Sequence, residues 1–242
     1  MTIQANTKVR EIALEVPQAT KLFEKFGIDY CCGGEKPLAE ACATAGVEIE
    51  DVLQMLAGAP NVTAQESAGL DFQKFTLTQL IGHILDEHHV YTKAEMARLE
   101  SLIEKVITAH GQNHPELREI ALLFQSLCND LKPHLFKEEQ VLFPYIVALE
   151  SSGPERQAPF AFFGTVNNPI KMMMTEHDTA GDILRQLRSL SSDYAVPADG
   201  CISYQTLYQA LEAFEKDLHQ HIHLENNILF PRAIELEGRR AA

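Results

Sequence analysis

Two stretches of the chain repeat one pattern of chemically active side chains. Residues 134–144 read HLFKEEQVLFP and residues 221–231 read HIHLENNILFP, so both fit H-x-x-x-E-x-x-[VI]-L-F-P. Residues four positions apart on an α-helix lie on the same face, one turn from each other. Each copy therefore presents an imidazole and a carboxylate together, and both groups are ligands of transition-metal ions. The pattern predicts a metal site that takes ligands from both copies.

Helical phase indicates which of the ten histidines face a core. His221 lies on a stripe of apolar residues that includes Phe214 and Leu218. His219 and His223 lie on a polar stripe of the same helix and are expected to face solvent. One histidine of the second copy is therefore expected to point inward.

The same test applied to the other helices completes an inward-facing set. On the first long helix it favours His89 over His88, because Met96 and Leu99 follow His89 at the spacing of one helical face. The predicted set has four histidines and two glutamates from four helices: His89, His134, Glu138, His177, His221 and Glu225.

The composition of this set predicts two metal ions. A single histidine on an apolar stripe is more often a hydrogen-bonded core residue than a metal ligand. Two carboxylates in one core, however, would each cost on the order of several kcal/mol without a cation beside them. Four imidazoles and two carboxylates exceed the four ligands of a zinc site. Mixed nitrogen and oxygen donors without thiolate favour iron, with manganese next. We therefore expect two iron ions joined by oxo and carboxylate bridges.

Three further carboxylates lie close to these histidines in the sequence. Asp130 and Asp217 each precede a predicted ligand by four residues, and such a carboxylate can accept the second N–H of a ligating imidazole. An exposed position on the helix is an equal alternative for both. Glu176, next to His177, is expected to line an access route or to lie on the surface.

Four long helices are needed to carry the six residues. Apolar residues recur at helical spacing over 77–109, 115–150, 169–190 and 203–237, with loops between these segments. This organisation predicts an all-α fold with an up-down-up-down four-helix bundle. Pro144 and Pro231 lie inside two of the helices and predict a kink in each. The loop 151–169 contains FAFFG, an apolar insert that is expected to tuck against the protein.

The first 57 residues predict a small module of short helices that contains adjacent cysteines. Residues 58–73 are rich in Gly, Ala and Ser and predict a linker, which leaves 74–242 for the bundle. Cys31 and Cys32 lie in GIDYCCGG, where a turn near a helix start would make a thiol more reactive. As a bare pair they favour a structural role. The other cysteines are expected to fill cores: Cys42, Cys128 and Cys201.

Charge and composition limit the classes of partner. The formal net charge is −14 with 20 Lys and Arg against 34 Asp and Glu, so nucleic acid and anionic membranes are not expected partners. The chain has no apolar run long enough to span a bilayer, and its first residues lack the apolar segment of a signal peptide. Five unevenly spaced cysteines do not form a disulfide framework, so we expect a reducing, cytoplasmic location.

Together these motifs resemble a known family. The order of His before Glu, with more imidazole than carboxylate, is similar to hemerythrin-like di-iron bundles. The combination of DYCCGG, a linker, HLFKEEQVLFP and HIHLENNILFP resembles the iron-sulfur cluster repair di-iron proteins over nearly the whole chain. A longer loop at 151–169 is the visible departure. The resemblance places the family's metal ligands on the six residues selected above and its cysteine pair on Cys31 and Cys32.

The resemblance also implies a function. The family is a cytoplasmic, non-haem di-iron group that repairs iron-sulfur clusters after nitrosative or oxidative stress, by iron donation with help from thiols. Its expected partners are iron-sulfur client proteins and small ligands such as NO, dioxygen or peroxide, and the chain would be a monomer or a homodimer. Two alternatives stay open: an enzyme that reduces NO to nitrous oxide, and a hemerythrin-like carrier or sensor that only binds dioxygen or NO.

Overall fold

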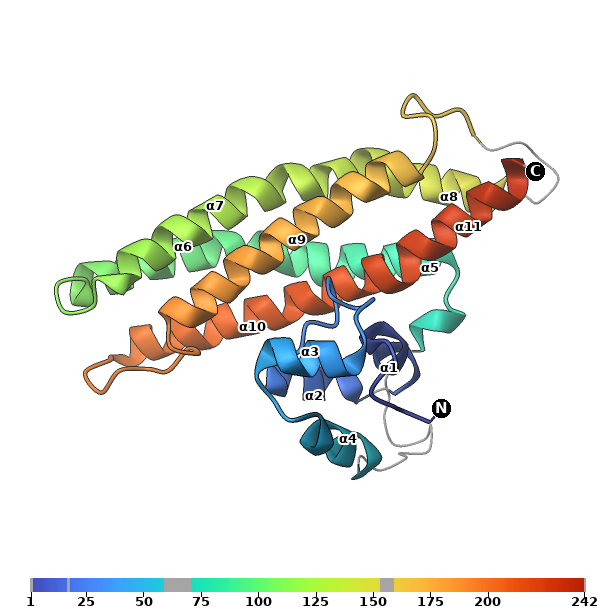
Figure 1. Cartoon of the computed structure of the whole chain (residues 1–242). Coiled ribbons are helices and arrows are strands. Elements are labelled where there is room, and N and C mark those ends of the chain that lie inside the picture. Colours follow the sequence, from blue (N-terminus) through green and yellow to red (C-terminus); the bar gives the residue numbers. More distant parts are fainter. Residues whose placement is uncertain (1, 17, 59–70, 153–158, 242) are drawn as a thin grey trace.

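Four long helices form an up-and-down bundle, and a smaller helical module lies against one side of it (Figure 1). The structure is a computed structural model that describes residues 2–16, 18–58, 71–152 and 159–241. Within these ranges the regular structure is helical, apart from one isolated bridge between Lys8 and Pro37. The predicted all-α fold is confirmed. None of the described helices combines the length and the apolar character needed to cross a membrane.

Three of the four long helices are interrupted by a π-helical turn. The first comprises α5 (Leu77–His83), the π-helical η2 (Ile84–His89) and α6 (Val90–His110). The second comprises α7 (Glu116–Lys137), the π-helical η3 (Glu138–Leu142) and α8 (Phe143–Ser151). The third is α9 (Asn167–Leu190). The fourth comprises α10 (Ile202–Leu224), the π-helical η4 (Glu225–Leu229) and α11 (Phe230–Ala241). A short 3-10 turn, η1 (Phe72–Lys74), precedes the first helix. These spans agree with the predicted helices to within four residues.

Two of these three π-helical turns lie where the sequence predicted proline kinks. η3 ends two residues before Pro144, and η4 ends two residues before Pro231. A proline has no N–H for the carbonyl four residues earlier, so the regular ladder is broken at this point in any case. In both helices the N–H of the preceding phenylalanine bonds to the carbonyl five residues back, on Glu138 or Glu225. The motif therefore combines a predicted ligand with a local widening of the helix.

The bundle core consists of two apolar clusters on either side of a polar layer. One cluster includes Phe124 and Phe214, and the other includes Phe143 and Phe230. The ligand-bearing turns lie between them along each helix. Pairs of ligand-bearing helices run along one another, α7 with α9 and α6 with α10. Packing of the two clusters thus fixes the four helices at the level of the polar layer.

The N-terminal module has a separate core. It contains α1 (Val9–Glu15), α2 (Ala19–Phe26), α3 (Leu38–Ala45) and α4 (Ile49–Gly58), packed around residues such as Ile12 and Phe23. Gly27, in the left-handed conformation at φ 64°, ends α2 and starts the turn that carries the cysteines. Most of the predicted linker, residues 59–70, lies outside the described residues.

The module covers a face of α10 that the sequence assigned to solvent. His223 is only 4% exposed and lies against the ring of Tyr30, with the ring centroids 5.3 Å apart. His219 is partly buried and its Nδ1 lies 2.9 Å from Glu24 Oε1. The prediction that both histidines face solvent is therefore wrong. Helical phase correctly identified a polar stripe on α10, but residues of the module, rather than water, contact the side chains of this stripe.

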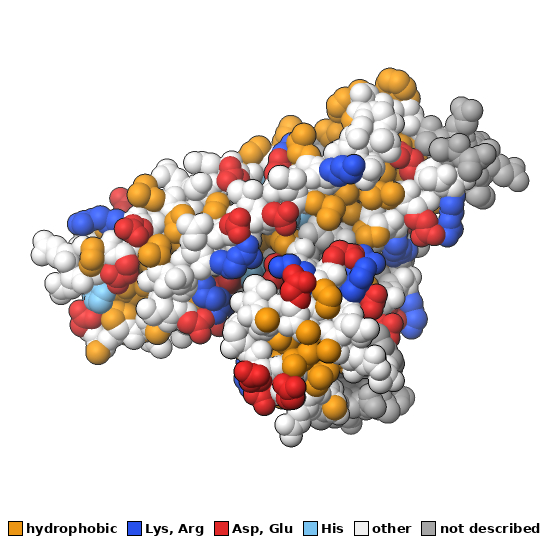
Figure 2. Space-filling model, viewed as in Figure 1, with side chains coloured by type: hydrophobic (Ala, Val, Ile, Leu, Met, Phe, Trp, Pro, Cys, Tyr) orange, Lys and Arg blue, Asp and Glu red, His pale blue; other side chains and the backbone are white. Residues whose placement is uncertain are grey.

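The apolar loop before α9 is only partly packed. Phe163 contacts Tyr145, with ring centroids 5.0 Å apart. Phe160 and Phe162 are 95% and 80% exposed, so the expectation that the whole FAFFG insert tucks in is wrong. Apolar side chains gather over this loop at the top of Figure 2.

An ion pair between Arg188 and the buried Glu215 joins α9 to α10, and it supplies a test of the fold. Arg188 on α9 donates to both oxygens of Glu215 on α10, and Glu215 is 2% exposed. Replacement of Arg188 by Met leaves a buried carboxylate without its cation, so the free energy of unfolding should fall by about 3 kcal/mol. The control Arg239→Met removes an exposed pair on α11 and should change it by less than about 0.5 kcal/mol. Urea melts of both variants measure the difference, and equal values would contradict the role assigned to the pair.

Candidate metal centre

The six residues selected by helical phase meet in the polar layer of the bundle. His89 comes from the end of η2, His177 from α9, and each copy of the repeated motif supplies one histidine and one glutamate. Each of the six is buried, with an exposed fraction of 3% or less. The folded chain therefore brings together all the residues that the sequence proposed as ligands.

The ligand atoms form two groups that share both carboxylates. One group contains His89, His221 and the two glutamates, and the other contains His134, His177 and the same two glutamates. Within each group the ligand atoms lie within 4.8 Å of one another. This arrangement provides two adjacent positions for metal ions, with Glu138 and Glu225 placed between them.

The distances within each group fit ligands of a common ion. The Nε2 atoms of His89 and His221 are 3.2 Å apart, as are those of His134 and His177. Glu225 places Oε1 3.1 Å from His221 Nε2 and Oε2 3.2 Å from His177 Nε2. Two ligands that bind one ion at 2.0–2.2 Å are separated by about 3.0–3.5 Å at the usual coordination angles. Metal ions at these positions therefore need little movement of the side chains.

The electrostatics of the layer also call for cations. Within the described structure, neither oxygen of Glu138 has a hydrogen-bond partner, and both lie fully buried. Burial raises the pKa of Glu138 to about 8, with a further contribution from the charge of Glu225. Burial lowers the pKa of His221 to about 4, so its imidazole is neutral, which is the form that binds metal. The raised pKa of Glu138 favours its protonated form at neutral pH, and against the effect of burial the neighbouring Glu225 carboxylate raises the pKa of His177 to about 9. Two divalent or trivalent ions would displace these protons and compensate the carboxylate charge.

Two of the four histidines are oriented at Nδ1 by residues of the repeated motif. His89 Nδ1 lies 2.8 Å from Glu139, and His177 Nδ1 lies 2.9 Å from Asn226 Oδ1. Glu139 and Asn226 occupy the same position of the repeated motif, directly after the shared glutamate. Each holds the histidine of a neighbouring helix and points its Nε2 into the site. The sequence signal for this role is the polar residue that follows the shared glutamate in both copies, Glu139 in one and Asn226 in the other.

The remaining two histidines have different surroundings. His134 Nδ1 lies 2.8 Å from Glu176, whose pKa is lowered to about 2 by its hydrogen bonds from His134 and Lys137. In the other half His88 takes the place of Glu176, next to the ligand histidine, and its ring stacks on that of His221. The two halves of the site are therefore not equivalent.

Asp130 and Asp217 do not take the proposed role of accepting from the second N–H of His134 and His221, which leaves their alternative position away from these rings. Helical phase favoured His89 over His88 as the inward residue, yet His88 is buried as well and its Nδ1 lies 3.0 Å from Asp217. Asp217 therefore contacts His88, and among the described residues His221 Nδ1 has no hydrogen-bond partner. Asp130 does not contact His134 Nδ1, which binds Glu176. These contacts come from other helices, and the spacing along one helix cannot reveal them.

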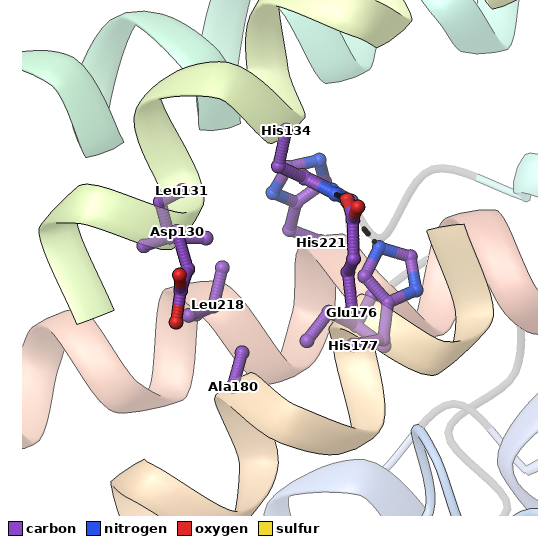
Figure 3. Close-up of a pocket in the computed structure, with 9 residues that line it drawn as sticks. Asp130, Leu131, His134, Glu176, His177, Ala180, Leu218 and His221 are labelled. Atoms are coloured by element: carbon purple, nitrogen blue, oxygen red, sulfur yellow. Dashed lines mark hydrogen bonds and ion pairs between the residues drawn. The ribbon is translucent and has the colours of Figure 1, made fainter. Parts of the chain in front are cut away.

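A small, partly open cavity adjoins three of the histidines. Figure 3 shows His134, His177 and His221 at one side of it and Asp130 and Ala180 at the other. It has room for about one water-sized molecule, and its lining is mainly apolar, with Leu131, Leu218 and Ile222 completing the wall. A small uncharged ligand could reach the metal positions from this side.

The cysteine turn of the module lies directly against the centre. Cys32 Sγ is 3.6 Å from the carbonyl oxygen of His177, and Asn226 donates from Nδ2 to the carbonyl of Cys31 at 3.3 Å. Asn226 thus connects the cysteine turn with the ring of a ligand histidine. Cys42 and Cys128 fill cores as expected, whereas Cys201 is exposed at the start of α10 and corrects that prediction.

Comparison with known proteins covers both parts of the chain. Residues 80–233 match the hemerythrin HHE cation binding domain family, and residues 5–59 match a family described as a domain of unknown function, DUF542. A probable iron-sulfur cluster repair protein from Haemophilus influenzae is 32% identical over 95% of this chain and 97% of its own length. Proteins named iron-sulfur cluster repair protein YtfE are similarly close. The one from Dickeya chrysanthemi is 35% identical over 94% of this chain and 96% of its own. The one from Yersinia pseudotuberculosis is 33% identical over 96% and 98%.

The contacts of Asn226 predict a selective loss of metal affinity. Asn226→Ala removes the group that orients His177, so the affinity for a divalent metal should fall by about 10- to 100-fold. Asn227→Ala is the matched control, because Asn227 bonds to Tyr30 and His223 but to no proposed ligand. Metal titration of both variants by calorimetry measures the difference, and an equal affinity would show that Asn226 does not position the ligand.

Proposed function

Because the chain belongs to the family of iron-sulfur cluster repair proteins with a hemerythrin HHE domain, we propose that it repairs iron-sulfur clusters damaged by nitrosative or oxidative stress. The observation that carries the proposal is the pair of His2Glu2 groups that share Glu138 and Glu225. Iron-sulfur proteins whose clusters have lost iron are the proposed clients, and iron is the proposed cargo.

The proposed cofactor is a pair of iron ions. His89 and His221 would bind one ion, His134 and His177 the other, and both glutamates would bridge them. The donor set supports iron, because it consists of imidazole and carboxylate without thiolate. When bound, the ions supply exchangeable iron and a centre that can accept or donate electrons. Each ion would then be held by two histidines and two glutamates, and an octahedral ion takes six ligands, so two positions would stay open for small ligands.

The side chains around the centre have separate proposed roles. Glu139, Glu176 and Asn226 hold three of the imidazoles in place and so determine how firmly each ion is bound. Cys31 and Cys32 are the proposed thiols for iron transfer or for redox assistance. Their contact with His177 supports this assignment, because a thiol used in transfer must lie close to the metal.

Reduction of NO is the second candidate function, and the small cavity is the observation that favours it. Its apolar walls beside three ligand histidines suit a small uncharged molecule such as NO or dioxygen. A carrier of dioxygen would use the same cavity but would not require cysteines against a ligand helix. Five free thiols support the proposed cytoplasmic, reducing location. A monomer or a homodimer is proposed as the assembly.

Repair activity should depend on the shared glutamates. An iron-loaded chain added anaerobically to an iron-sulfur dehydratase inactivated by NO should restore its activity, and Glu225→Gln should lower that restoration about tenfold or more. Glu212→Gln is the matched control, because Glu212 lies on α10 and pairs with Lys216 at the surface. Dehydratase activity and iron content of both variants are the measurements.

This experiment, together with an assay for nitrous oxide, separates the candidate functions. Restoration by wild-type chain and by Glu212→Gln, with loss in Glu225→Gln, agrees with repair. If the reduced protein instead forms nitrous oxide from NO over several turnovers and restores no dehydratase activity, repair is wrong and NO reduction takes its place.

A further inference from the structure

The cysteine turn contains a second group of metal-binding side chains. Asp29, Cys31 and Cys32 each place one ligand atom within 4.8 Å of the others. None of the three belongs to the centre in the bundle, so the turn is a separate constellation. It combines two thiols with one carboxylate, a donor set that differs from the imidazole and carboxylate of the bundle.

The distances within this group fit a tetrahedral ion. The two sulfur atoms are 3.8 Å apart, and Cys31 Sγ lies 3.4 Å from Asp29 Oδ1. An ion that binds two thiolates at 2.3 Å with tetrahedral angles separates them by about 3.8 Å, and a thiolate from a carboxylate oxygen by about 3.6 Å. A disulfide would need the sulfur atoms at about 2.05 Å. The side chains therefore already have the spacing of ligands around one ion.

The turn holds this spacing through its backbone. The N–H of Cys32 donates to Asp29 Oδ1 at 2.9 Å and so fixes the carboxylate beside the thiols. A Cβ atom at Gly33 would lie 3.0 Å from the Asp29 carbonyl oxygen and 3.2 Å from its carboxylate. A Cβ atom at Gly34 would lie 3.0 Å from the carbonyl oxygen of Tyr30. A side chain at either position would therefore make its neighbours shift by a few tenths of an ångström, so the two glycines let the chain close tightly around the three donors.

The bundle completes the surroundings of the group. Gly181 on α9 faces Cys32, where a Cβ atom would lie 3.7 Å from its sulfur. Arg185, one turn further along α9, places its guanidinium 3.6 Å from Asp29 Oδ2. Two thiolates and a carboxylate carry −3, so a divalent ion leaves −1, which Arg185 offsets. Figure 2 shows charged side chains of both signs where the module meets the bundle.

Access to the group is one-sided. Cys31 is buried at 4% exposure, whereas Cys32 is partly exposed and the Asp29 side chain is 36% exposed. An ion can thus approach from solvent past Asp29 and Cys32, while Cys31 closes the inner side. Three protein ligands leave the fourth tetrahedral position open.

We infer that Asp29, Cys31 and Cys32 form a second metal site, which takes a single divalent transition-metal ion and leaves one position for a ligand from outside. Binding releases two thiol protons and transfers no electron. A water molecule or a cysteine thiolate of a client protein fits the open position. The site lies between the metal centre and solvent, connected to His177 through Asn226. The proposal that this site binds iron on its way from the bundle centre to a client protein rests on the proposed repair function. The proposal that the site binds a metal ion does not.

Cobalt(II) is the probe that tests this site. The chain is first loaded with two equivalents of iron, one for each position in the bundle, and is then titrated anaerobically with Co(II). One additional ion per chain should bind, with thiolate-to-cobalt charge transfer in the near ultraviolet and the visible bands of tetrahedral cobalt. Cys31→Ser and Cys32→Ser should each abolish the charge-transfer band, and Asp29→Asn should weaken binding about tenfold or more. Cys201→Ser, which removes the exposed thiol on α10, should leave both unchanged. Unaltered iron content and helicity show that each variant is folded.

The outcomes distinguish the site from the repair function. Absence of the charge-transfer band in the wild-type chain, or its survival in Cys31→Ser and Cys32→Ser, overturns the site even where repair proceeds normally. Binding of Co(II) by wild-type chain, with its loss in the cysteine variants, supports the site even where the chain repairs nothing. Repair that continues at the wild-type rate in Asp29→Asn overturns the transfer role alone.

Discussion

Burial of two carboxylates in the middle of a helical bundle is the constraint on which the rest of the structure depends. Glu138 and Glu225 are inaccessible to solvent, and within the described structure three of their four oxygens have no hydrogen-bond donor. Ionised carboxylates in such a place are strongly destabilising without cations. The four histidines around them are arranged in two pairs, each at ligand separation from both glutamates. The layer has an electrostatic explanation when metal ions occupy both positions, and the apolar clusters above and below then hold the helices at the right spacing.

The repeated motif does more than supply the proposed ligands. In each copy the residue after the shared glutamate holds a histidine of a neighbouring helix, and a π-helical turn begins at the glutamate itself. The two halves differ in detail, with Glu139 in one and Asn226 in the other. Asn226 also reaches the cysteine turn, so the second copy of the motif joins the metal centre to the module. The module therefore lies against residues of the candidate metal centre. Its contacts with α10 explain why His219 and His223 are shielded from solvent.

The sequence was sufficient to predict the long helices and the six proposed ligands, because both depend on helical periodicity and on a repeat. His89 could be separated from His88 by phase, since only His89 is in step with the apolar residues that follow it. The burial of His88 and His223 could not be predicted, because it depends on partners in other elements, Asp217 for one and Tyr30 for the other. The position of the cysteine turn could not be predicted either, because residue spacing carries no information about how the N-terminal module packs against the bundle.

The most direct test of a two-metal centre is anomalous X-ray diffraction from crystals of the purified protein, recorded on either side of the iron absorption edge. The account predicts two iron peaks between Glu138 and Glu225, one flanked by His89 and His221 and the other by His134 and His177. A single peak, or peaks that arise from zinc alone, would contradict it.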